Sequence, residues 1–249
     1  MSQRRFIVSP AQLKTELVIL DPGEASHAQR VLRLRVGDEV WLLDGNGNQA
    51  LAIIERLSPM LCRVTHRPRW QPPRPRLVIV LGMSKNPAME LLAQKFTELM
   101  VDEIRPFNAS RSVSEPGANK TERWARISQQ ALKQCGAARA PMISSPAGLA
   151  DIVARAPQDA LKIIAFEEEE QVSFKQLLPE QAPPEIWAIV GPEGGLTAEE
   201  VATASQAGFI SCQLTASILR SETAALVLAG MLRCYWNNVN VQDKAELSS

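Results

Sequence analysis

The sequence lacks several features that mark large classes of protein. It contains no run of 18 apolar residues, so we expect no membrane span. Its first six residues include two arginines and no apolar region of the kind that a secretory signal needs, and we expect no such signal. The four cysteines contain no Cys-x-x-Cys pair. Together these absences favour a cytoplasmic protein with reduced thiols in a bacterial-type cytosol.

Common catalytic motifs are missing as well. Only two histidines occur, His27 and His66, and they lie too far apart along the chain to predict a metal site. The motifs HExxH, GK[ST] and GxSxG do not occur, which argues against zinc peptidases, P-loop enzymes and α/β-hydrolases.

Charge is distributed unevenly, although the formal net charge is zero. Residues 1–76 carry 12 Lys and Arg against 7 Asp and Glu, a net charge of +5, and the remaining residues carry the opposite excess. Clustered cations are typical of proteins that bind a polyanion, because phosphate contacts release counterions. We therefore expect RNA or DNA to contact the first third of the chain, the alternative being a solvated arginine-rich surface.

A proline-rich segment at residues 68–75, with four prolines in eight residues, predicts an extended linker. Before it, residues 39–43 and 50–55 are predicted strands, and Asp44-Gly45-Asn46-Gly47 supplies the turn between them. A small β-rich barrel fits this part of the chain. The sequence Gly45-Asn46-Gly47-Asn48-Gln49-Ala50 also matches a dinucleotide fingerprint, but a strand follows it where the fingerprint needs a helix, so we favour the hairpin.

After the linker, buried-type strands alternate with amphipathic helices, which predicts a mostly parallel α/β sheet. Strands are expected at residues 77–81, 163–166, 186–190 and 209–214. One helix is expected to start after Asn86 as cap, with an apolar stripe reaching Met100, and a second to stop at Gly136. A last, apolar helix is expected from about Glu222 to Trp236, and the residues after Asn238 are expected to form a frayed tail.

Two loops that follow buried strands are candidates for ligand binding. Residues 190–196, Val-Gly-Pro-Glu-Gly-Gly-Leu, place three glycines around a proline, which lets bare backbone approach a ligand. Thr197-Ala198-Glu199-Glu200 then predicts a capping box that opens a helix. Residues 214–224, Leu-Thr-Ala-Ser-Ile-Leu-Arg-Ser-Glu-Thr-Ala, suit a loop around a polar ligand, or a helix start with Ser221 as its cap.

These two loops together resemble the SPOUT methyltransferases, and within them the bacterial enzymes that methylate N3 of a uridine in 16S ribosomal RNA. Residues 27–38, His-Ala-Gln-Arg-Val-Leu-Arg-Leu-Arg-Val-Gly-Asp, resemble the N-terminal signature of that family. Glu98-Leu99, Glu122-Arg123-Trp124 and Gln134-Cys135-Gly136 extend the resemblance over nearly the whole chain.

The resemblance implies a PUA-like RNA-binding β-barrel at residues 1–72 and a SPOUT α/β methyltransferase domain with a deep trefoil knot at residues 73–249. It implies S-adenosylmethionine as cofactor, no metal, and a homodimer that acts on ribosomal RNA or the small ribosomal subunit. The implied cofactor-binding residues are Phe166, Glu167, Val190, Gly191, Pro192, Glu193, Gly194, Gly195, Leu214, Thr215, Ile218, Leu219, Arg220, Thr223 and Ala224.

Charge and chemistry assign further roles. Arg220, the only cation in its loop, is the candidate for stabilising charge on the uracil, with Glu222 as its neighbouring carboxylate. The candidate RNA-binding residues are Arg4, Arg5, His27, Arg30, Arg33 and Arg35. Arg33 and Arg35 are expected to share one face of an extended segment.

The chain departs from the family pattern where basic residues are common, at Ala88, Ala137 and Ser217. These losses leave two alternatives open. One is a non-catalytic RNA-binding or ribosome-assembly factor, and the other is a SPOUT methyltransferase that acts on a different RNA base.

Overall fold

The computed structural model describes residues 4–112 and 120–236, so the tail expected after Asn238 lies outside the described residues. The chain divides into two compact units. The first unit comprises residues 1–72, 93–100 and 118–142, and the second comprises residues 73–92, 101–117 and 143–249. Each unit is therefore built from segments that are not continuous along the sequence.

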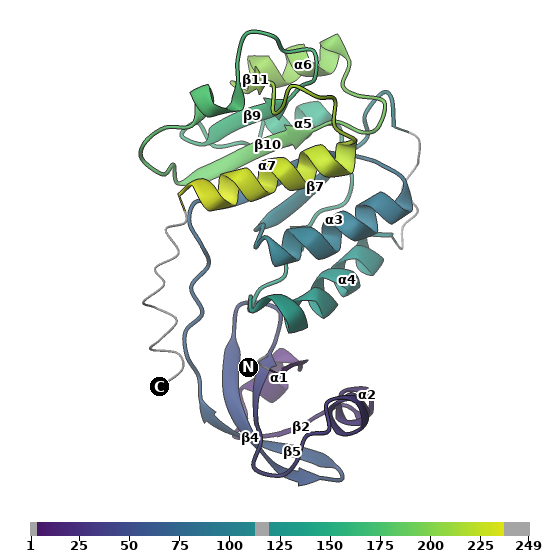
Figure 1. The fold of residues 1–249 in the computed structure, drawn as a ribbon, viewed down its shortest axis with the longest axis vertical. Coiled ribbons are helices and arrows are strands. Elements are labelled where there is room, and N and C mark those ends of the chain that lie inside the picture. The colour runs from purple at the N-terminus through teal and green to yellow at the C-terminus, as the bar shows by residue number, and fades with distance from the viewer. Residues whose placement is uncertain (1–3, 113–119, 237–249) are drawn as a thin grey trace. The chain divides into compact units, whose positions relative to one another are not determined.

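The first unit contains one five-stranded sheet with the order β1-β3-β4-β5-β2. β1 and β3 are parallel, and the other neighbours are antiparallel. Its elements are β1 (Arg5–Ile7), α1 (Pro10–Leu13), β2 (Leu17–Ile19), α2 (Pro22–Ser26), the π-helix η1 (His27–Val31), β3 (Glu39–Leu43), β4 (Gln49–Leu57), β5 (Met60–His66) and α4 (Lys120–Cys135) (Figure 1). Alternate residues of the long strand β4 are buried, which is the pattern of a sheet with one covered face.

The predicted hairpin is confirmed. The strand expected at residues 39–43 is β3, and its return strand β4 is slightly longer than expected. Gly45 and Gly47 have φ angles of 75° and 102°, which glycine adopts without a Cβ clash. The buried Asp44 carboxylate accepts hydrogen bonds from the backbone N–H groups of Asn46 (2.8 Å) and Asn48 (3.1 Å), so it holds the turn together.

The expectation that Arg33 and Arg35 alternate along an extended segment is wrong. Residues 27–31 form a π-helix, and Arg33 has a φ of 55°, in the left-handed region. The backbone turns here because Leu34 is buried and its N–H donates to the carbonyl of Ala28 (3.0 Å). The signature region is thus a compact turn instead of a strand.

The second unit contains a six-stranded sheet with the order β11-β9-β10-β6-β7-β8. The pairs β11–β9, β9–β10, β10–β6 and β6–β7 are all parallel, as the strand–helix alternation predicts. The strands are β6 (Arg76–Gly82), β7 (Glu103–Phe107), β8 (Met142–Ile143), β9 (Leu161–Ala165), β10 (Glu185–Val190) and β11 (Ile210–Cys212). Its helices are α5 (Leu149–Val153), the 3-10 helix η2 (Phe174–Leu177), α6 (Ala198–Gln206) and α7 (Ser221–Tyr235). The helix α3 (Asn86–Glu98) is divided between the units, with its residues up to Leu92 in the second.

Both ends of α3 differ from the sequence-based expectation. α3 ends at Glu98, because Met100 has a φ of 54° and turns the chain toward β7. Asn86 is the first helical residue of α3 and not its cap, since the Lys85 carbonyl accepts from the N–H groups of Ala88 and Met89. α4, by contrast, stops before Gly136 (φ 82°) as predicted.

Helices cover both faces of the parallel sheet. α5 and α6 contribute to an apolar core with Val78, Val80 and Ile189. α7 crosses the sheet and contacts β6 and β10 (Figure 1). Its buried side chains include Leu228 and Leu232, while Met231 and Tyr235 are exposed. Among the described helices, none is both long enough and apolar enough to cross a membrane.

Candidate active site

The carboxyl ends of three parallel strands meet at one edge of the six-stranded sheet. The strand register places Val190 at the end of β10 level with Leu81 of β6 and Ala165 of β9. The strand order reverses beside β6, because β7 and β8 follow it on one side of the sheet, whereas β9, β10 and β11 lie on its other side. Open α/β sheets bind ligands in the crevice at such a reversal of strand order. A cavity of 620 Å³ lies here, within the usual size range of small-molecule sites.

The glycine-rich loop after β10 forms one wall of this cavity. Gly195 has a φ of 72°, and its N–H donates to the Pro192 carbonyl (2.9 Å), which closes the loop into a tight turn. A Cβ on Gly195 would lie 2.5 Å from Glu167 Oε1, so a side chain here meets Glu167. Thr197 then caps α6 through the predicted capping box with Glu200.

The loop after β11 forms the opposite wall and leads into α7. The N-cap of α7 is Arg220, whose side chain makes no capping bond, so the alternative that Ser221 is the cap is wrong. Ser221 is the first helical residue, and its buried hydroxyl donates to the Gly191 carbonyl (2.6 Å). This bond joins the two loops, although they lie 30 residues apart in sequence.

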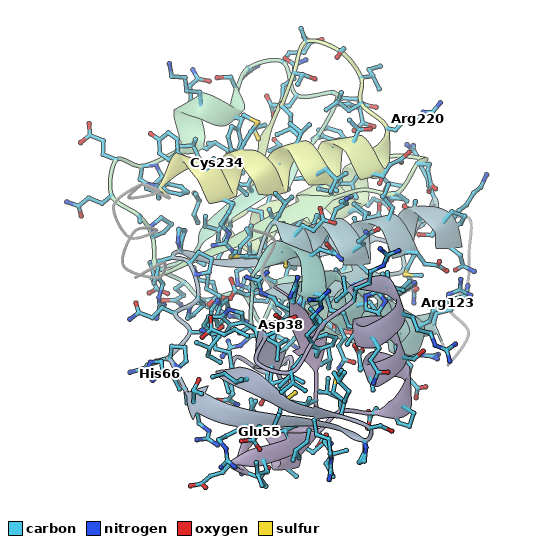
Figure 2. All side chains as sticks on the ribbon, turned by 60° about the horizontal axis from the view of Figure 1, so that its bottom comes forward. Asp38, Glu55, His66, Arg123, Arg220 and Cys234 are labelled. Carbon is cyan, nitrogen blue, oxygen red and sulfur yellow. The ribbon has the colours of Figure 1, made fainter. Side chains whose placement is uncertain are left out.

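Charged side chains of both signs line the cavity. Lys85 and Arg220 are its cations, and Glu167, Glu193 and Glu222 are its carboxylates. The Arg220 side chain is exposed and makes no hydrogen bond or ion pair with the described residues. Figure 2 labels Arg220 at the start of α7 and Cys234 near the other end of that helix. A free guanidinium at the mouth of a cavity is suited to binding a negatively charged or carbonyl-rich group.

The Cys212 thiol, at the end of β11, is buried. Burial and, to a smaller extent, the nearby Glu169 carboxylate raise the pKa of Cys212 to about 12. Burial likewise raises the pKa of Cys62 to about 11. Within the described ranges, no group of three or more His, Cys, Asp or Glu side chains is arranged to hold a metal ion.

Most of the residues expected to bind the cofactor lie together. A second, smaller cavity of 70 Å³ adjoins the first and shares Ala165, Glu167, Ile218, Leu219 and Ala224 with it. The expected residues that line one or both cavities are Phe166, Glu167, Val190, Gly191, Pro192, Glu193, Gly195, Leu214, Thr215, Ile218, Leu219, Arg220 and Ala224. Gly194 and Thr223 line neither, although Gly194 accepts a hydrogen bond from Arg111 (3.2 Å). Glu222, expected as a neighbour of Arg220, also lines the larger cavity.

Sequence reasoning missed the wall that follows β6. Lys85, Pro87, Ala88 and Leu91 line the larger cavity, and the Lys85 N–H donates to Glu193 Oε1 (3.2 Å). Among them, only Ala88 stood out in the sequence, as a position where the family commonly has a basic residue. Their position after the carboxyl end of a buried strand is the signal that could have found them.

Five of the six candidate RNA-binding residues are exposed, and the sixth, Arg5, is half-buried. His27, Arg30, Arg33 and Arg35 are exposed. Arg4 is exposed but pairs with Asp38 (3.1 Å), whose carboxylate also accepts from the backbone N–H of Arg35 (2.8 Å).

Arg5 differs from these residues because it is half-buried beside Gly136, where its Nη2 lies 3.2 Å from the position of a Cβ. Burial lowers the pKa of its guanidinium. Arg5 therefore packs within the first unit, while the other five lie at its surface.

Comparison with known families identifies the family of the chain. The model of an RNA methyltransferase domain matches residues 71–233, and that of an RNA methyltransferase PUA domain matches residues 20–65. The chain belongs to the RNA methyltransferase family. The PUA match lies before the proline-rich segment at residues 68–75, and the methyltransferase match begins within that segment.

Several relatives of this RNA methyltransferase carry the name ribosomal RNA small subunit methyltransferase E. The protein from Mesomycoplasma hyopneumoniae is 33% identical over 63% of this chain and 68% of its own. That from Mycobacterium bovis is 27% identical over 86% of this chain and 85% of its own. A putative methyltransferase from Legionella pneumophila, solved in complex with bound S-adenosylmethionine, is 27% identical, with a TM-score of 0.81 over 94% of this chain and 98% of its own.

Proposed function

We propose that this RNA methyltransferase transfers a methyl group from S-adenosylmethionine to N3 of a uridine in 16S ribosomal RNA. One observation carries the proposal: a cavity of cofactor size lies at the carboxyl ends of parallel strands, between the glycine-rich loop and the loop that ends in Arg220 and Glu222. The names of the relatives and the cofactor bound to the Legionella protein support the substrate class and the cofactor.

The residues around the cavity fit S-adenosylmethionine. The glycine-rich loop presents backbone without side chains at Gly191 and Gly195, where an adenosine can pack closely. Glu167, Glu193 and Glu222 provide negative charge that favours a sulfonium, and Lys85 provides positive charge for a carboxylate. The bound cofactor supplies an electrophilic methyl group, and this chemistry needs no metal.

The two charged residues at the start of α7 are suited to the acceptor base. Uracil N3 must lose its proton, and negative charge then spreads onto the two neighbouring carbonyl oxygens. Arg220 stabilises that charge, because its guanidinium has no competing partner among the described residues. Glu222 accepts the proton or orients Arg220. Holding both reactants in line supplies much of the remaining rate enhancement.

Further features belong to this proposal. The second unit forms the deep trefoil knot that the resemblance to the SPOUT methyltransferases implies. The protein is a cytoplasmic homodimer acting on the small ribosomal subunit, and the exposed Met231 and Tyr235 of α7 supply apolar surface for dimer contacts. Along the sequence, the PUA-like and methyltransferase domains divide between residues 72 and 73, although residues 93–100 and 118–142 pack with the first unit.

Two measurements test the proposed function. Isothermal titration should detect micromolar binding of S-adenosylmethionine. Incubation of the protein with this cofactor and 16S rRNA or small subunits from a strain lacking the enzyme should produce 3-methyluridine, detected by nucleoside mass spectrometry. A different methylated base would contradict the choice of uracil N3. RNA binding with no cofactor binding would favour the non-catalytic RNA-binding factor.

The basic surface of the first unit gives a separate prediction. A triple change of Arg30, Arg33 and Arg35 to Ala should weaken RNA binding and reduce its dependence on salt, with a slope smaller by about 0.7–0.9 for each phosphate that the variant no longer neutralises. Filter binding between 50 and 300 mM salt measures both quantities. Unchanged affinity and slope would mean that these arginines are only solvated.

A further inference from the structure

A third cavity lies wholly within the first unit and is separate from the proposed cofactor site. It has a volume of 340 Å³ and is formed by α1, the β3–β4 turn and the start of the proline-rich segment. Its lining residues are Pro10, Leu13, Lys14, Asp44, Gly47, Asn48, Gln49, Arg67, Pro68, Arg69 and Trp70.

The aromatic wall of this cavity is held in place. Trp70 packs against a small apolar cluster that includes Leu43 and Leu132. The Arg139 guanidinium lies 5.9 Å from the centre of the Trp70 ring. Gly47 fits beside both groups, because a Cβ there would lie 3.4 Å from Arg139 and 3.7 Å from Trp70. The indole is therefore a pre-ordered surface, which lowers the entropic cost of placing a ligand against it.

The charged side chains of the cavity are mostly cationic, with three cations against the single carboxylate of Asp44. Arg67 is engaged locally, since its guanidinium donates to carbonyls at the end of α1, including that of Thr15 (2.8 Å). Lys14 and Arg69 are exposed and make no ion pair or side-chain hydrogen bond with the residues that the structure describes. Two cations are thus available for an anionic ligand.

The Asp44 carboxylate, the one anion among the lining residues, is not available to neutralise Lys14 and Arg69. The Asp44 carboxylate is 6% exposed and accepts three hydrogen bonds from the β3–β4 turn, including one from the Asn48 side-chain amide (2.6 Å). Its charge is therefore already stabilised within the turn. Asn48 and Gln49 also give the wall polar amide groups.

An aromatic side chain beside amides and available cations is the combination that binds unpaired nucleotides, by stacking on the base and pairing with the phosphate. We propose that this cavity holds one nucleotide of the single-stranded RNA substrate, with the base against Trp70 and the phosphate against Lys14 and Arg69. This inference rests on the proposed function in one respect, which is the identification of the bound polymer as RNA. It adds an anchoring site for a nucleotide other than the one that is methylated.

The test compares three variants with wild type by fluorescence anisotropy, using a labelled 12-nucleotide single-stranded RNA, the matching RNA duplex, and free uridine monophosphate as competitor. Lys14→Gln/Arg69→Gln removes the two available cations without touching the apolar cluster. Trp70→Leu removes the aromatic surface, and Trp70→Phe keeps it. The control is Arg155→Gln/Lys175→Gln, which removes two exposed cations that line none of these cavities.

For single-stranded RNA, we expect about tenfold weaker binding in Trp70→Leu and substantial rescue in Trp70→Phe. Lys14→Gln/Arg69→Gln should weaken binding and reduce the salt slope by about 1.4, while the control should match wild type. Cofactor titration should be unchanged in all variants, which separates failure of this site from failure of the proposed function.

Equal single-strand affinity in wild type, Trp70→Leu and the Lys14/Arg69 variant would overturn the proposal. So would equal losses on the duplex, which would indicate a general electrostatic surface. Full competition by uridine monophosphate at micromolar concentration would also overturn it, because the cavity would then be a site for a free nucleotide.

Discussion

The two ends of the parallel sheet in the second unit use charge in opposite ways. At the amino ends of the strands, Arg76 of β6 pairs with both Glu103 of β7 and Glu185 of β10. At the carboxyl ends, Arg220 has no partner among the described residues, and bare glycine backbone lines a cavity. The amino end of the sheet therefore carries charged side chains that pair with each other, and the carboxyl end carries a guanidinium that is available to a ligand.

The paired end is also the more buried one. Asp102 accepts from the backbone N–H of Leu77 (2.9 Å) and pairs with Arg233 of α7 (3.2 Å), whose side chain is only 6% exposed. Arg233 also donates to the Pro75 carbonyl (2.8 Å). Burial lowers the pKa of Arg233, and the Asp102 carboxylate opposes that shift. Charges used in this way fix the positions of strands and helix, whereas unpartnered charges remain available to a substrate. Substitutions at the two ends should consequently have different signatures.

The largest expected effect is on stability at the amino end. Asp102→Ala should lower the free energy of unfolding by about 3–5 kcal/mol, because it leaves the buried Arg233 without its carboxylate. Denaturant titration measures the loss, with the exposed Asp159→Ala as control. At a temperature where the variant is folded, its affinity for S-adenosylmethionine should stay within about twofold of wild type. A larger loss of affinity would show that the two ends are not independent.

At the carboxyl end, Arg220→Ala should reduce single-turnover methyl transfer about 10²–10³-fold, as expected for the loss of a group that stabilises developing charge. Its melting temperature and cofactor affinity should remain close to those of wild type, since the side chain is exposed and makes no hydrogen bond or ion pair with the described residues. Arg220→Lys should recover only part of the rate, because lysine keeps the charge but loses the planar fork. Full activity in Arg220→Ala would remove it from the catalytic residues.

A smaller effect, on both stability and binding, is expected where α7 meets the glycine-rich loop. Ser221→Ala leaves the buried Gly191 carbonyl without its donor, which should cost about 1–3 kcal/mol of stability. Because Gly191 lines the cavity, cofactor affinity should also fall several-fold. Calorimetry and titration measure the two losses, with the exposed Ser205→Ala as control. Lost stability with intact affinity would mean that this bond holds the fold and not the site.

Local sequence patterns predicted the helices, strands and loops of this protein well, because the residues that determine each of them lie close together in the sequence. The Gly45–Gly47 turn follows from residues that tolerate positive φ, and the strand at residues 77–81 follows from a continuous apolar run. Thirteen of the fifteen residues expected around the cofactor line one of two adjoining cavities. That part of the prediction came from the resemblance to a family and not from periodicity.

What the sequence could not predict depends on pairing between distant segments. Arg76 and Glu185 are 109 residues apart, and only the β6–β10 register brings them together. The wall formed by Lys85 and Leu91 was missed for the same reason, since no local motif marks it. Arg33 was misjudged because burial of Leu34 required a left-handed turn, which the alternating arginines did not reveal.

The parallel pairing of β6 with β10 has a consequence for how fast the protein acquires its activity. Closing a loop of more than 100 residues carries a large entropic cost before any contact repays it, whereas β3, β4 and β5 pair with their neighbours in sequence. During refolding, the antiparallel strands should gain protection from hydrogen exchange earlier than the central parallel strands. The ability to bind S-adenosylmethionine should return last, because its cavity exists only after β6, β9 and β10 lie side by side.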